Sequence, residues 1–104
     1  MPLPPPQDQH IALDLASALT RRFRSSVDPT DVKACLFLRQ FVDELLARPG
    51  VAGVRLYFAR NAVGQNSLVM VGVDQDGNDV TAGTILYNHF PCPPFCDTGS
   101  ALNG

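Results

Sequence analysis

The sequence predicts an α+β fold in which two N-terminal helices precede a three-stranded antiparallel meander, and it allows a short extra strand near residues 33–37. Two observations predict this fold. In the first half of the chain, apolar residues recur every three or four positions, which is the spacing of one helix face. In the second half they alternate with other residues or form short apolar runs between turn sequences, which is typical of strands.

The composition suits a single globular domain. The chain has 104 residues, of which 45% are hydrophobic and 17% are charged. Its net charge of −2 provides no general attraction for nucleic acid or for an anionic membrane, so neither is expected as a partner. No export signal and no membrane-spanning apolar run are visible, and we expect a soluble, cytoplasmic protein.

The first predicted helix follows a proline-rich tail at residues 1–7, and one domain covers residues 8–104. Asp8 is a plausible N-cap, and apolar residues follow at intervals of four: Ile11, Leu15, Leu19 and Phe23. The pattern predicts a helix over about 9–24.

The second predicted helix has a clear end and an uncertain start. Asp28 and Pro29 form a strong helix-start signal, yet the apolar run at 33–37 fits a buried helix segment or a short strand equally well. Residues 39–47 carry an apolar helical face, which Pro49 and the following glycine terminate.

Three strands are expected in the second half. Val54, Leu56 and Phe58 alternate with other residues, as in a half-buried strand. Residues 67–74 are apolar on both faces, which predicts the central strand. The Asp76-Gly77 pair predicts a hairpin turn, and residues 79–90 can return as the third strand before an extended C-terminal tail from about residue 91.

Three strings in this half resemble a family of short uncharacterised bacterial proteins: "PGVAGVRLY", "LVMVGVDQDGND" and "CPPFC". The resemblance covers about residues 41–97. It also favours a strand at 33–37, because the family has a similar segment before its helix. It implies no activity, substrate or partner, so no residue receives a role from it.

The stretch "HFPCPPFCD" brings three potential metal ligands together: His89, Cys92 and Cys96. Two thiolates and an imidazole suit Zn or Cu, and the candidates for a fourth ligand are Cys35, His10 or Asp97. The site needs a turn at Pro94 and Phe95, or a cis bond before Pro94, because extended prolines would hold the thiols apart. A disulfide or redox pair, or thiols that only pack beside Phe90 and Phe95, are the alternatives.

No catalytic pattern is recognisable. The chain lacks a nucleophile elbow, a phosphate-binding loop and a dinucleotide fingerprint. The acidic turn "DQDGND" departs from a calcium loop, because Asp79 stands where that loop requires glycine. We therefore expect a small non-enzymatic structural or interaction module, with a protein partner or self-association. The alternative is a small Zn or Cu protein that uses His89, Cys92 and Cys96 and has no other assured cofactor.

Overall fold

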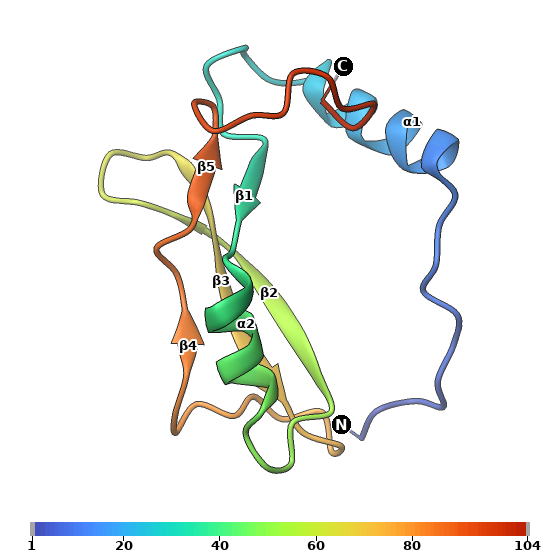
Figure 1. Cartoon of the computed structure of the whole chain (residues 1–104), viewed down its shortest axis with the longest axis vertical. Coiled ribbons are helices and arrows are strands. Elements are labelled where there is room, and N and C mark those ends of the chain that lie inside the picture. The colour runs from blue at the N-terminus through green and yellow to red at the C-terminus, as the bar shows by residue number, and fades with distance from the viewer. Residues whose placement is uncertain (1, 104) are drawn as a thin grey trace.

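A computed structural model describes residues 2–103 of the chain, and it has the predicted α+β architecture (Figure 1). Within these residues there are two helices and two antiparallel sheets. The elements are α1 (Leu13–Arg24), β1 (Ala34–Leu36), α2 (Arg39–Leu46), β2 (Gly53–Arg60), β3 (Asn66–Val73), β4 (Ile85–Leu86) and β5 (Phe90–Cys92). Neither helix of the described chain is long and apolar enough to cross a membrane.

The larger sheet is the predicted meander, with strand order β2-β3-β4 and β3 in the centre. Its third strand is much shorter than the predicted range of 79–90. Asp79 forms an isolated bridge with Val73, and regular pairing resumes only at β4. The register changes between the two pairings, since Val73 lies opposite Asp79 but Val71 lies opposite Ile85. In the segment between them the Ala82 carbonyl accepts a hydrogen bond of 2.6 Å from Arg48 Nη2.

The short strand allowed at 33–37 is present as β1, but it does not join the meander. It pairs with β5 in a separate ribbon, in which Ala34 lies opposite Cys92 and Leu36 opposite Phe90. In Figure 1 this ribbon is drawn in the upper half of the view, level with the loop that joins β2 and β3. The expected extended tail from about residue 91 therefore begins inside a strand.

The predicted start of the first helix is wrong, and of the two alternatives left open after Asp28 the strand is the one that forms. α1 begins at Leu13 without a side-chain cap, because the Asp8 carboxylate instead accepts a hydrogen bond of 2.9 Å from the backbone N–H of His10. The signal at Asp28 produces a closed turn, in which its carbonyl accepts the Asp31 N–H at 3.0 Å. No helix follows there, because the next residues extend to pair with β5.

The core lies between α2 and β3. Leu45 of α2 is 1% exposed, and Met70, Val71 and Val73 of β3 are also buried. Gly72 gives the helix room to approach, because a Cβ atom there would lie 3.0 Å from Val51 Cγ2 and 3.4 Å from Leu45 Cδ2. The helix predicted over 39–47 and the central position of β3 are thereby confirmed.

Candidate functional site

The two C-terminal cysteines are joined in a disulfide between Cys92 and Cys96, with their Cα atoms 4.8 Å apart. The turn between them contains cis bonds before Pro93 and Pro94, and the Phe95 N–H donates to the Pro91 carbonyl at 2.9 Å. The expectation that such a turn brings the two sulfurs together is confirmed. A disulfide is unusual in a reducing cytoplasm, so the cytoplasmic location stays a prediction.

His89 faces the larger sheet. Its Nε2 atom lies 3.0 Å from the hydroxyl of Ser67 on β3 and accepts the Leu68 N–H at 3.4 Å. The ring also stands edge-on to Phe37 and Tyr87, with centroids at 5.5 and 5.6 Å. The imidazole is therefore used to hold β3, and not to complete a cluster with the sulfurs.

The candidates for a fourth ligand are dispersed. His10 pairs through Nδ1 with Asp8 at 2.5 Å, and Asp97 accepts the Gly99 N–H at 3.1 Å. Cys35 keeps a free thiol whose pKa is raised by burial. Among residues 2–103 no three His, Cys, Asp or Glu side chains gather as a metal site. The oxidised sulfurs do not fit Zn or Cu in this arrangement, and metal binding stays a prediction for the reduced chain.

The Ser67–His89 pair was missed by sequence reasoning, because 22 residues separate its members and no local pattern links them. Nε2 faces the Ser67 hydroxyl and the Leu68 N–H, while the buried Nδ1 meets no hydrogen-bond partner within residues 2–103. A serine nucleophile needs an exposed hydroxyl and an acidic group that orients the imidazole. Ser67 is only 4% exposed, and no acidic group in the described part of the chain bonds to Nδ1, so the pair is suited to structural support.

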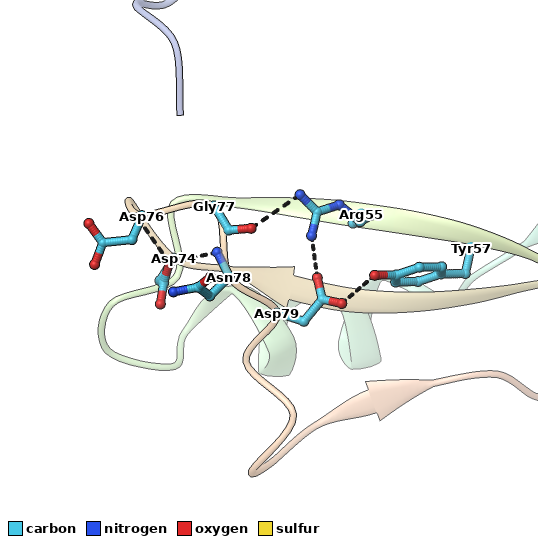
Figure 2. A network of polar contacts seen from close by, with 7 residues as sticks. All are labelled: Arg55, Tyr57, Asp74, Asp76, Gly77, Asn78 and Asp79. Carbon is cyan, nitrogen blue, oxygen red and sulfur yellow. Dashed lines mark hydrogen bonds and ion pairs between the residues drawn. The ribbon is translucent and has the colours of Figure 1, made fainter. Parts of the chain in front are cut away.

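A second polar network links β2 to the turn that follows β3, as Figure 2 shows. Arg55 Nη1 donates to Asp79 Oδ1 at 2.5 Å, and the Tyr57 hydroxyl donates to the other carboxylate oxygen. The hydrogen bond from Tyr57 and the Arg55 guanidinium hold the pKa of Asp79 below its usual value. These three residues belong to the strings quoted above, yet the strings alone did not show that they meet.

The turn itself is the predicted hairpin turn around Asp76-Gly77. Asp74 Oδ1 accepts the N–H groups of Asp76 and Asn78 at 2.9 and 3.0 Å, and Gly77 adopts a φ of 82° (Figure 2). The Gly77 carbonyl also accepts a hydrogen bond of 3.3 Å from Arg55 Nη2. Arg55 is therefore engaged with Asp79 and Gly77 on the face of the sheet opposite to α2.

The apolar side of β2 is left uncovered. Val54 lies opposite Gly72 and Phe58 opposite Leu68, so these residues share the face on which α2 packs. α2 does not reach the far end of β2, where Phe58 is 94% exposed. Val54 and Leu56 are exposed as well. The prediction of a half-buried strand holds for its spacing, but the apolar half lies on the α2 face largely beyond the reach of α2 and stays exposed.

The apolar side of α1 is also open. Its hydrogen bonds to the rest of the chain come from its polar residues: Ser17 Oγ donates to the Ala101 carbonyl at 2.9 Å, and Arg24 donates to that of Leu102. Leu15, Leu19 and Phe23 remain about half exposed. An open hollow of about 460 Å³ beside Phe23 is lined by β1 and by Phe58, which makes this surface continuous with that of β2.

The total area shows how much surface is uncovered. The chain exposes 7782 Å². A compact monomer of 11.2 kDa exposes about 5,700 Å². The radius of gyration is 15.3 Å, whereas about 13 Å is typical of a compact domain of this length. The excess is about 2,100 Å² per chain on this scale.

Comparison of the chain with protein-family models, with curated proteins and with solved structures found no match.

Proposed function

We propose that this chain is a small non-enzymatic interaction module that assembles with a second copy of itself. The observation that carries the proposal is the uncovered apolar surface of α1 and β2. Large apolar side chains exposed over a continuous area mark sites of association.

The area favours a second copy over a small ligand or a short peptide. The excess is spread over the whole described chain, including the exposed segment at residues 2–12. Two chains that each cover half of it bury about 2,100 Å² in total, at the lower end of the range of obligate homodimers, about 2,000–5,000 Å². Such interfaces are as apolar as a domain core cut in half, and leucine, valine and phenylalanine dominate here. A short peptide would leave much of this surface exposed.

Light scattering coupled to size exclusion tests the proposal over a range of concentrations. The expected mass is twice 11.2 kDa. A chain that stays monomeric at every concentration, and that unfolds in one cooperative transition, would contradict self-association. A complex of fixed stoichiometry with a different protein would instead assign the surface to that partner.

A further inference from the structure

The outer edge of β2 is free. β2 lies at one end of the strand order β2-β3-β4, and no strand within residues 2–103 pairs with its second edge. An edge strand presents alternate N–H and C=O groups that another strand can bind, and proteins usually block such edges with a charge, a proline, a bulge or a short strand.

β2 carries few of these protections. It has eight residues, no proline and continuous pairing with β3 over its whole length. The charge in its middle belongs to Arg55, which is bonded to Asp79 beyond β3 and is thus directed away from the free edge. The edge is therefore long, regular and largely apolar.

We infer that β2 pairs antiparallel with β2 of a second copy, across a two-fold axis that passes beside Leu56. The inference rests on the proposed function and names its surface and register. The two three-stranded sheets become one continuous sheet, and a two-fold axis perpendicular to it keeps α2 of both copies on the same face.

The register follows from the side chains. With Leu56 opposite its own copy, Val54 lies opposite Phe58 and Arg55 lies opposite Tyr57. Every member of the apolar face then meets an apolar partner, and no like charges are opposed. An axis beside Arg55 would oppose two guanidinium groups, and one beside Tyr57 would place Val54 opposite Arg60. An axis beside Leu56 therefore gives the most favourable set of opposed side chains.

The face that this pairing completes is the one that α2 leaves open. Phe58 of one copy covers Val54 of the other, and both are exposed in the single chain. Cross-strand aromatic and β-branched pairs of this kind stabilise sheets. The pairing thus satisfies the free backbone edge and brings the exposed side chains of Val54 and Phe58 together in one step.

Cysteine cross-linking tests the register. The variant Leu56→Cys is made in a Cys35→Ser background, so that the native disulfide and one new thiol remain. Directly opposed residues have Cα atoms about 4.5–5.5 Å apart, within the range of about 4.4–6.8 Å that a disulfide spans. Mild oxidation is expected to convert most of the protein to a covalent dimer on a non-reducing gel.

The matched control is Phe58→Cys in the same background. Its two copies lie on opposite sides of the axis, displaced by about 14 Å along the strands, and are expected not to cross-link. Adding Val54→Cys to Phe58→Cys restores an opposed pair and is expected to restore the covalent dimer. This second pair also covers the case in which Leu56→Cys fails to fold.

The outcomes separate the two proposals. Suppose that the protein is dimeric by light scattering but cross-links neither through Leu56→Cys nor through the Val54→Cys, Phe58→Cys pair. That result overturns this register and leaves the proposed function standing. A protein that cross-links through Phe58→Cys alone also overturns the register. A chain that is monomeric at every concentration overturns both.

Discussion

Phe58 allows the interface to be measured without disturbing the single chain. Its side chain is 94% exposed, so Phe58→Ala is expected to change the unfolding free energy of the monomer by less than about 0.5 kcal/mol. In the dimer it covers Val54 of the second copy. A cross-strand pair of an aromatic and a β-branched side chain contributes about 0.2–1 kcal/mol, and the two-fold axis creates two such pairs. The loss is therefore about 0.4–2 kcal/mol, which weakens the dimer by a factor of about 2–30.

Sedimentation equilibrium over a dilution series measures this change in the dimer Kd. The control is Phe95→Ala, which removes a ring that is 59% exposed on the C-terminal turn, outside β2. It is expected to leave the Kd unchanged. Equal Kd values for Phe58→Ala and the unmodified chain would refute the assignment of β2 to the interface.

Three further predictions concern the single chain. Leu45→Ala removes a side chain that is 1% exposed and is expected to lower the free energy of unfolding, measured by chemical denaturation, by about 2–5 kcal/mol. Leu46→Ala removes a neighbouring side chain that is 49% exposed and is expected to lower it much less. The pKa of Asp79 is lowered from 3.8, so its stabilising effect is present above pH 3.8 and is lost as the pH falls through the lower folded-state pKa. Asp79→Asn should remove that part of the pH dependence of the thermal unfolding temperature. An unchanged pH profile would show that the network is not formed. Thiol titration in denaturant is expected to find one free thiol before reduction and three after it. The double variant Cys92→Ser, Cys96→Ser should lower the free energy of unfolding by about 2 kcal/mol. Three free thiols without reductant would contradict the disulfide and reopen the metal hypothesis.

Sequence patterns located most elements because they are local. The alternation at 53–60 and the two-sided apolar run at 67–74 predicted β2 (Gly53–Arg60) and β3 (Asn66–Val73) closely. The start signal at Asp28 failed because pairing between β1 and β5, which joins residues far apart in the chain, outweighed a local helix preference.

The candidate site was predictable only in part, for the same reason. The prolines showed that Cys92 and Cys96 meet if the chain turns between them, and the structure has that turn. Whether the sulfurs then bind each other or a metal depends on oxidation, which a residue pattern does not record. The contact of His89 with Ser67 joins separate strands, and the link from Arg55 to Asp79 does the same.

The position of His89 has a consequence for how the molecule opens. The β1–β5 ribbon and the larger sheet share no backbone strand pairing among residues 2–103, and the imidazole between them holds Ser67 on one side and meets Phe37 on the other. Segments that share no strand pairing can open as separate cooperative units. In hydrogen exchange, we therefore expect the amides of β1 and β5 to lose protection together, while those of β3 retain it until the whole chain unfolds.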